Sequence, residues 1–233
     1  MLVGPGMFNN KLKNYDNNEM KEYSTYVFDL DGTLLSTLGD LAASTNYALR
    51  LNGMPERTED EVRRFVGNGV RALIERAVPG CGSNPRFDSV LADFKRHYME
   101  HSLDTTQPYP GVVEMLAGLR ERGKRVAVVS NKFYAATQNL CSHFFGPLVE
   151  VAIGERDGIR TKPAPDTVIE ALKQLGVGRV GAVYIGDSDV DVATARNSGL
   201  PCISVLWGFR DKDFLLEHGA VAFISEPSEL LNF

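Results

Sequence analysis

The 233-residue sequence contains no hydrophobic run long enough to span a membrane, and residues 1–20 lack the apolar stretch of a signal peptide. Cysteine is also scarce. Cys81, Cys141 and Cys202 are odd in number and form no CxxC pair, which argues against a disulfide framework and against a cysteine metal site. These absences predict a protein of the reducing cytoplasm that has no membrane partner.

An excess of positive charge is also missing. The 25 Lys and Arg residues face 30 Asp and Glu residues, which gives a formal net charge of -5. A broad basic surface for nucleic acid is therefore not expected, although a local pocket can still hold a small anionic ligand. Small molecules are the expected partners, and the sequence favours no particular oligomeric state.

What the sequence does contain is an alternation of short β-branched runs with amphipathic stretches, which is typical of a parallel sheet covered by helices. Strands are predicted within residues 25–30, 125–130, 149–154, 181–187 and 201–208. Ligands of open α/β sheets bind at the carboxyl ends of the strands. Asp29, Ser130 and Asp187, which end three of these runs, are therefore expected to meet at one edge of the sheet.

About ninety residues separate the first two predicted strands, too many for a single crossover helix. Helical spacing recurs within residues 38–49, 59–78 and 87–103, so the insertion is predicted to be a helical cap. The predicted fold is α/β: a Rossmann-like three-layer core of residues 24–36 and 106–233, with a cap of residues 37–105. Residues 1–23 are predicted to form a flexible tail, within which Met20 is an alternative start.

Two carboxylates, Asp29 and Asp31, flank one leucine in the stretch FDLDGT. Side chains at i and i+2 of an extended segment point the same way, so a cation between them or a proton on one of them is needed. A carboxylate can attack phosphorus, and Asp29 is the expected nucleophile. Asp31 is expected to protonate the leaving oxygen and then to accept a proton from water, with its pKa raised by burial and by the nearby like charge. Taken alone, the motif also fits an ordinary turn.

Asp187 and Asp191 lie four residues apart at the start of a predicted helix. Carboxylates on one helix face suit a hard cation, and Mg²⁺ is the expected ion. For Asp191, capping of the helix and a role outside direct coordination remain open.

Three further residues are expected to bind phosphate. Ser130 ends a predicted strand and offers a hydroxyl, and the amide of Asn131 follows at a helix start. Lys162 precedes the rigid stretch PAPD, so its ammonium can neutralise the acids and stabilise charge on a transferring phosphoryl group.

In order along the chain, FDLDGT, VVSNK, TKPAPD and IGDSDVD resemble the four signatures of the haloacid dehalogenase superfamily, and the resemblance spans residues 26–206. The insertion VRRFVGNGVRALIERA is similar to the cap of the phosphoglycolate phosphatase branch. The resemblance implies a Mg²⁺-dependent phosphatase with an aspartyl phosphate on Asp29, Asp31 as acid and base, and the backbone carbonyl of Asp31 as a metal ligand. One departure is Ser36, where phosphoglycolate phosphatases often carry Asp.

Phosphoglycolate is the leading substrate implied by this resemblance. Arg71 in the cap and Lys132 in the core are hypothetical contacts for a substrate carboxylate. Alternative functions are a sugar phosphomutase, a pyrophosphatase or nucleotidase of the same superfamily, and a non-enzymatic receiver-like module. A carbon-halogen hydrolase is disfavoured because dehalogenases of this superfamily do not need the second acid, Asp31.

Overall fold

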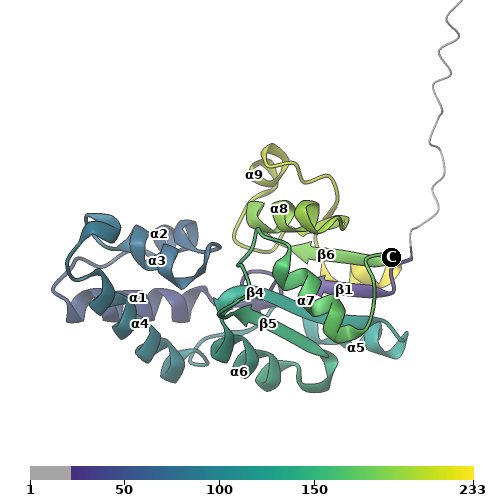
Figure 1. Cartoon of the computed structure of the whole chain (residues 1–233), viewed down its shortest axis with the longest axis horizontal. Coiled ribbons are helices and arrows are strands. Elements are labelled where there is room, and N and C mark those ends of the chain that lie inside the picture. Colours follow the sequence, from purple (N-terminus) through teal and green to yellow (C-terminus); the bar gives the residue numbers. More distant parts are fainter. Residues whose placement is uncertain (1–21) are drawn as a thin grey trace, which may run out of the picture.

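A six-stranded, all-parallel sheet forms the centre of the computed structural model, which describes residues 22–233 (Figure 1). Its strand order is β5-β4-β1-β6-β7-β8. The strands are β1 (Thr25–Phe28), β4 (Arg125–Phe133), β5 (Val151–Glu155), β6 (Ala182–Gly186), β7 (Cys202–Val205) and β8 (Phe223–Ile224). The predicted Rossmann-like parallel core is confirmed. The two-residue strand β8 was not predicted, because so short a run has no recognisable period.

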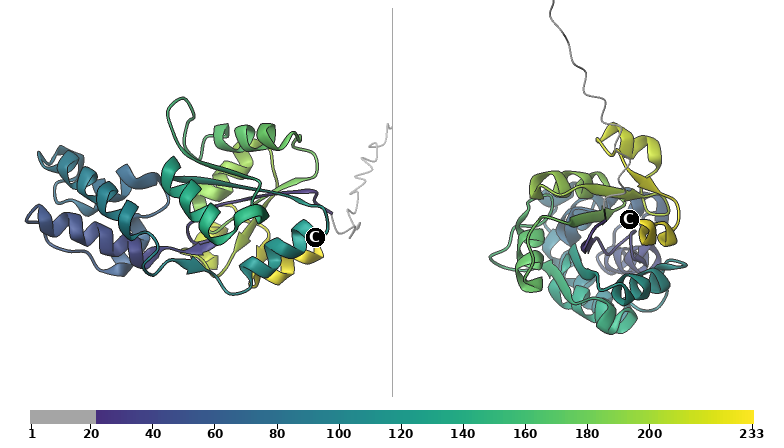
Figure 2. Two further views of the ribbon diagram at one scale, coloured as in Figure 1. Left: turned by 90° about the horizontal axis from the view of Figure 1, so that it is seen from below. Right: turned by 90° about the vertical axis from the view of Figure 1, so that its right-hand side faces the viewer.

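Helices cover both faces of this sheet (Figure 2). Alternate residues of β1 point to opposite faces, with Tyr26 and Phe28 in one apolar cluster and Val27 in another. The first face packs against α5 (Val112–Glu121), α6 (Tyr134–Phe144) and the short helix η3 (Pro227–Asn232). The second face packs against α7 (Asp166–Leu175) and α8 (Asp189–Ser198). The remaining core helices are η2 (Gly146–Leu148) and α9 (Lys212–Glu217).

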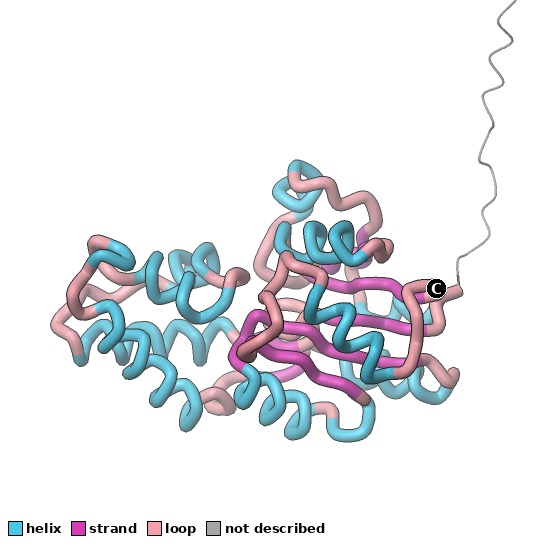
Figure 3. The backbone as a smooth tube through the Cα atoms, in the orientation of Figure 1, coloured by secondary structure: helices cyan, strands magenta, loops and turns pink. Residues whose placement is uncertain are grey.

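The inserted segment is a helical cap at one end of the sheet, as predicted (Figure 3). It contains α1 (Leu38–Leu51), α2 (Glu59–Phe65), α3 (Gly69–Ala77), η1 (Cys81–Ser83) and α4 (Phe87–His101). These helices enclose an apolar cluster of their own, in which Leu49, Ile74 and Phe94 are fully buried. The cap therefore has a hydrophobic cluster distinct from the two clusters on the faces of the sheet, although Ala136 of α6 also contributes to it.

Most of the predicted tail lies outside the described residues, but its last two positions contact the core. Glu22 forms an ion pair with Lys124, with Nζ 2.7 Å from the carboxylate oxygen, and Tyr23 packs beside Phe233. Residues 22 and 23, which were assigned to the tail, thus contact the core in the described part of the chain. Within residues 22–233, none of the helices combines the length and apolar character needed to cross a membrane.

Two linkers join the cap to the core, and they form a short antiparallel pair of β2 (Leu35–Ser36) with β3 (Gln107–Pro108). Next to this pair, the buried carboxylate of Asp40 accepts hydrogen bonds from the backbone and hydroxyl groups of Thr105 and Thr106, at 2.5–3.2 Å. Asp40 therefore fastens the start of the first cap helix to the returning linker.

Replacing Asp40 with Ala is expected to lower the free energy of unfolding by roughly 3 kcal/mol, because each buried donor left without a partner costs about 1–3 kcal/mol. Urea denaturation followed by circular dichroism measures this change. Asp104→Ala is the matched control in the same linker: Asp104 is exposed and paired only with His101, so a change within about 0.5 kcal/mol is expected. Equal losses in both variants would contradict the assigned role of Asp40.

Candidate active site

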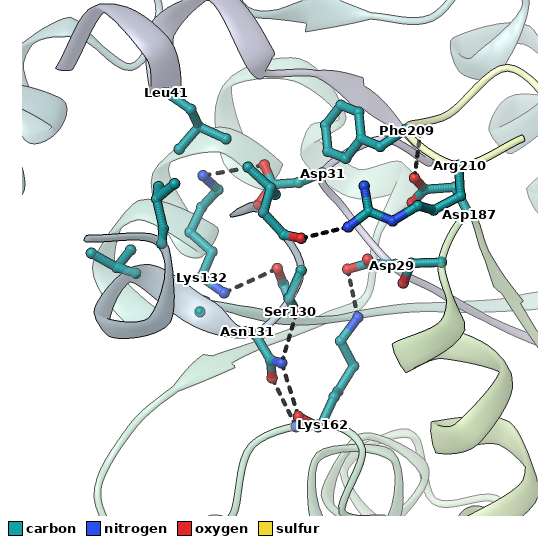
Figure 4. A pocket seen from close by; sticks show the side chains of 16 residues that line it. Asp29, Asp31, Leu41, Ser130, Asn131, Lys132, Lys162, Asp187, Phe209 and Arg210 are labelled. Atoms are coloured by element: carbon teal, nitrogen blue, oxygen red, sulfur yellow. Dashed lines mark hydrogen bonds and ion pairs between the residues drawn. The ribbon is translucent and has the colours of Figure 1, made fainter. Parts of the chain in front are cut away.

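Side chains from five separate segments of the core meet at the carboxyl edge of the sheet, under the cap (Figure 4). The central strand β1 pairs in register with both β4 and β6, so the ends of the three strands lie side by side. The core residues that line the resulting pocket are Asp29, Asp31, Ser130, Asn131, Lys132, Lys162, Asp187, Ser188, Phe209 and Arg210. The structure therefore brings together Asp29, Ser130 and Asp187, as the strand ends predicted.

The ammonium group of Lys162 lies at the centre of the buried charges. Its Nζ is 2.8 Å from Oδ1 of Asp29, 2.8 Å from Oδ1 of Asp191 and 3.1 Å from the hydroxyl of Tyr184. Burial opposes the charge of Lys162, but Asp191 and Asp29 outweigh this effect and raise its pKa. Burial, together with repulsion from Asp191, raises the pKa of Asp29 well above its usual range, although Lys162 opposes the shift.

Asp191 is fully buried, and both of its oxygens have partners. Oδ1 accepts hydrogen bonds from Lys162 and Tyr184, while Oδ2 accepts from the backbone and hydroxyl of Ser188 and from the backbone of Asp187. The pair Ser188 and Asp191 forms a capping box at the start of α8. The structure therefore shows Asp191 in the capping role, one of the alternatives left open by the sequence. Because both of its oxygens already accept hydrogen bonds, Asp191 suits a role next to a metal site without direct coordination.

Asp187 is held by groups from two other loops. Thr33 donates its hydroxyl to Oδ1 at 3.0 Å, and the backbone of Phe209 donates to Oδ2 at 2.7 Å. Burial and the nearby Asp191 raise the pKa of Asp187 to about 7. Gly208 allows this close approach, since a Cβ at position 208 would lie 2.2 Å from the Cβ of Asp187.

The buried acidic cluster fits a hard divalent cation. Oxygens of Asp29, Asp187 and Asp191 lie within 4.8 Å of one another. If all three acids of this cluster are ionised, their three negative charges and the one positive charge of Lys162, which is paired with Asp29 and Asp191, leave two negative charges. Oxygen donors with this charge are the set that such ions prefer in proteins.

Ser130 and Asn131 both line the pocket, but they lie within β4, which continues to Phe133. The prediction that the strand ends at Ser130 and that Asn131 stands at a helix start is therefore wrong, because α6 begins only at Tyr134. The hydroxyl of Ser130 accepts a hydrogen bond from the backbone of Lys132 at 3.2 Å. The side chain of Asn131 exchanges two hydrogen bonds with the backbone of Lys162 and donates a third to the carbonyl of Gly67 in the cap. Asn131 therefore links the lysine loop, β4 and the cap.

The two hypothetical substrate contacts have different surroundings from those expected. Arg71 is exposed on α3, its guanidinium carbon lies 4.8 Å from the centroid of the Phe87 ring, and it does not line the pocket. In this arrangement Arg71 is not a substrate contact. Lys132 does line the pocket, but its ammonium is already engaged, 3.1 Å from Asp31 Oδ1 and 2.8 Å from the hydroxyl of Tyr98.

Sequence reasoning missed Arg210, which also lines the pocket. It follows β7 and donates hydrogen bonds to three carbonyls of the cap, those of Arg63, Arg64 and Val66, at 2.9, 3.4 and 3.1 Å. Arg210 lies outside the four signatures. However, residues 201–208 were predicted as a strand, and ligands of open α/β sheets bind at the carboxyl ends of the strands. The same reasoning applied to this strand would have identified Arg210, two residues beyond its end, as a candidate.

The cap side of the pocket is apolar. Four cap side chains line it, and Phe209 of the core joins them; the cap residues are Leu41, Val66, Val70 and Leu73. Charge is thus concentrated on the core side, and the cap supplies a wall that can exclude water.

Comparisons with known proteins agree with this geometry. The model of the haloacid dehalogenase-like hydrolase family matches residues 26–205. A phosphoglycolate phosphatase of Caulobacter vibrioides is 35% identical over 193 residues, covering 81% of this chain and 81% of the relative. An N-acetylmuramic acid 6-phosphate phosphatase of Pseudomonas aeruginosa is 29% identical over 208 residues, covering 88% of this chain and 92% of the relative. A crystal structure from Lactobacillus delbrueckii subsp. bulgaricus, provisionally named a phosphoglycolate phosphatase, is 37% identical with a TM-score of 0.86, covering 90% of this chain and 97% of that one.

Replacing Gly208 with Ala is expected to displace Asp187 and to lower the free energy of unfolding by about 1–3 kcal/mol, the usual cost of overpacking. Gly178→Ala is the control, because a Cβ at position 178 meets no atom within 4 Å. That change should be neutral or slightly stabilising. Chemical denaturation of both variants measures the difference. A Gly208 variant as stable as the wild type would show that Asp187 can move without cost.

Proposed function

Because the chain belongs to the haloacid dehalogenase-like hydrolases, as its four signatures indicated, we propose that it is a magnesium-dependent phosphatase of small phosphomonoesters, acting through an aspartyl phosphate on Asp29. The observation that carries the proposal is the position of the Asp29 carboxylate. Oδ1 accepts a hydrogen bond from the backbone of Leu30 at 2.7 Å and is paired with Lys162. Oδ2 accepts no hydrogen bond from residues 22–233 and is available to a substrate in the pocket.

The reaction has two steps. In the first, an oxygen of Asp29 forms a bond to phosphorus as the bond to the leaving oxygen breaks, and that oxygen keeps the electron pair and takes a proton from Asp31. In the second, water attacks phosphorus and gives a proton to Asp31. The bond between phosphorus and Asp29 then breaks, and its electron pair returns to the carboxylate.

Three groups of the core suit the phosphoryl oxygens. Lys162 carries a positive charge paired with Asp29, Ser130 offers a hydroxyl, and Asn131, which also lines the pocket, has a backbone amide that would serve as a third donor. Asp29, Asp187 and the backbone carbonyl of Asp31 would hold magnesium, with Asp191 shaping the site from behind. When bound, the ion offsets negative charge on the acids and on the phosphoryl group.

Phosphoglycolate is the leading substrate of this proposal, supported by the name of the Caulobacter relative. The Pseudomonas relative is named for a different phosphate ester, so a panel of esters is the appropriate assay. Within the described residues, the cations that line the pocket are Lys132, Lys162 and Arg210, and only Arg210 lacks a carboxylate partner. We therefore assign Arg210, in place of Arg71, as the contact for a substrate carboxylate.

A phosphomutase, a pyrophosphatase and a nucleotidase of the same family would use the same core chemistry, and multiple turnover on simple monoesters separates the first of these from a phosphatase. The receiver-like alternative is disfavoured by the family match, because the matching model describes haloacid dehalogenase-like hydrolases and covers residues 26–205. All three cysteines are free thiols, which supports the cytoplasmic location predicted from the sequence.

Replacing Asp29 with Asn is expected to lower turnover of p-nitrophenyl phosphate with magnesium by at least about 10³-fold, because the amide cannot form the covalent intermediate. Release of p-nitrophenol over many turnovers measures the effect, with a chelator as the metal-free control. The midpoint of thermal unfolding should stay the same or rise, since the change removes repulsion with Asp191. Near-normal turnover by the variant would refute the nucleophile assignment.

Replacing Arg210 with Ala is expected to raise the Michaelis constant for phosphoglycolate by about 10-fold or more, since hydrogen bonds to charged groups contribute about 1.5–3 kcal/mol. The constant for ethyl phosphate, which has no carboxylate, should change much less. Arg71→Ala is the matched control and should affect neither substrate. Similar increases for both esters in the Arg210 variant would show that this arginine acts by holding the cap in place.

A further inference from the structure

A chain of three polar groups crosses from the cap to the catalytic edge of the sheet. Tyr98 belongs to α4 of the cap, Lys132 lies near the end of β4, and Asp31 follows β1. The ammonium of Lys132 donates a hydrogen bond to the Tyr98 hydroxyl at 2.8 Å, and it lies 3.1 Å from Oδ1 of Asp31. A side chain of the cap is thereby connected to the proposed acid and base through a single residue.

The Asp31 carboxyl group depends on this connection. Its buried Oδ1 accepts no hydrogen bond from residues 22–233, so the ion pair with Lys132 is the contact that restrains it. The other acids of the pocket differ, because Asp29, Asp187 and Asp191 all accept hydrogen bonds from backbone groups of the core. Asp31 is therefore the one pocket acid among these whose orientation is set by a lysine alone.

Lys132 in turn is fixed by Tyr98. The lysine is only 4% exposed, and its ammonium lies 4.3 Å from the centroid of the Tyr98 ring in addition to the hydrogen bond with its hydroxyl. The ring of Tyr98 is fully buried between Phe94, with centroids 5.5 Å apart, and Phe133, at 6.2 Å. A buried ammonium needs such partners, because its desolvation costs several kcal/mol.

We propose that Tyr98 and Lys132 are positioning residues, which together hold the Asp31 carboxyl group in place for proton transfer to the leaving oxygen. Because Tyr98 belongs to the cap and Lys132 to the core, this positioning is complete only while the cap covers the pocket as it does here. The inference rests on the proposed phosphatase function and deepens it: the cap takes part in the chemistry of the leaving group, in addition to excluding water.

The leaving group of the substrate provides the test. p-Nitrophenolate departs without a proton, whereas the alkoxide of ethyl phosphate needs one, and neither ester carries a second charged group that Lys132 could bind. A positioning role therefore predicts a loss of kcat/KM on ethyl phosphate and little change on p-nitrophenyl phosphate. Since kcat/KM covers the steps up to departure of the leaving group, the later attack of water does not obscure the comparison.

Tyr98→Phe is the mild variant, because it removes the hydroxyl and leaves the packed ring. It is expected to lower kcat/KM for ethyl phosphate about 10-fold, and Lys132→Met about 10²-fold, within the range of about 10²–10⁴ that general acid catalysis contributes. For Tyr98→Phe the value for p-nitrophenyl phosphate should stay within about two-fold of the wild type, and for Lys132→Met the loss on ethyl phosphate should exceed the loss on p-nitrophenyl phosphate by about 10-fold or more. Tyr47→Phe, elsewhere in the cap, is the matched control and should leave the ratio of the two substrates unchanged.

Equal losses on both esters, or no loss on either, would overturn the positioning role. If Lys132→Met fails to fold, as judged by thermal unfolding, Tyr98→Phe decides the question by itself. Failure of the proposed function has a different signature, because the wild-type protein would then hydrolyse neither ester in the presence of magnesium, and the inference would fall with it.

Discussion

The structure depends on one constraint: three carboxyl groups are buried close together, and a single ammonium group, that of Lys162, pairs with only two of them, Asp29 and Asp191. Two like charges 4 Å apart repel by about 4 kcal/mol at the effective dielectric constant of a protein. The fold offsets this repulsion with hydrogen bonds from the Ser188 and Tyr184 hydroxyls to Asp191 and from Thr33 to Asp187. With all three acids ionised, two negative charges would remain uncompensated, and a divalent cation would offset them.

This constraint extends to the backbone. The strand β6 must end with a glycine, because a Cβ at Gly186 would lie 2.3 Å from the Cβ of Asp191. The turn after Asp31 has the same requirement, since a Cβ at Gly32 would lie 2.5 Å from Oδ2 of Asp187, and its φ of +84° also favours glycine. Bringing acids this close together is possible only where neighbouring segments have no side chains.

The sequence was sufficient to predict the features that depend on local pattern. The apolar runs predicted five of the six strands of the sheet, and the number of residues between the first two predicted strands indicated an inserted cap. Because Asp29, Ser130 and Asp187 end three predicted strands, the sequence was enough to predict that their side chains lie close together. In contrast, the surroundings of Arg71 and Lys132 depend on contacts between segments that are distant in the sequence. The partner of Lys132 is an example: Tyr98 and Phe94 show only the i, i+4 spacing of any buried helix face. Nothing in the local sequence indicates that Tyr98 contacts a lysine 34 residues away.

The two carboxylates proposed for catalysis are thus supported in different ways, although they are only two residues apart. Asp29 is held by Lys162 and by a backbone amide, both of the core, so the nucleophile is in place whatever the cap does. Asp31 is held by Lys132, whose other partner belongs to the cap. In the proposed two-step hydrolysis the nucleophile has to meet every phosphate ester, whereas the leaving group varies with the substrate and would face the cap residues that line the pocket. Under this proposal, the domain that faces the leaving group also affects how that group is protonated.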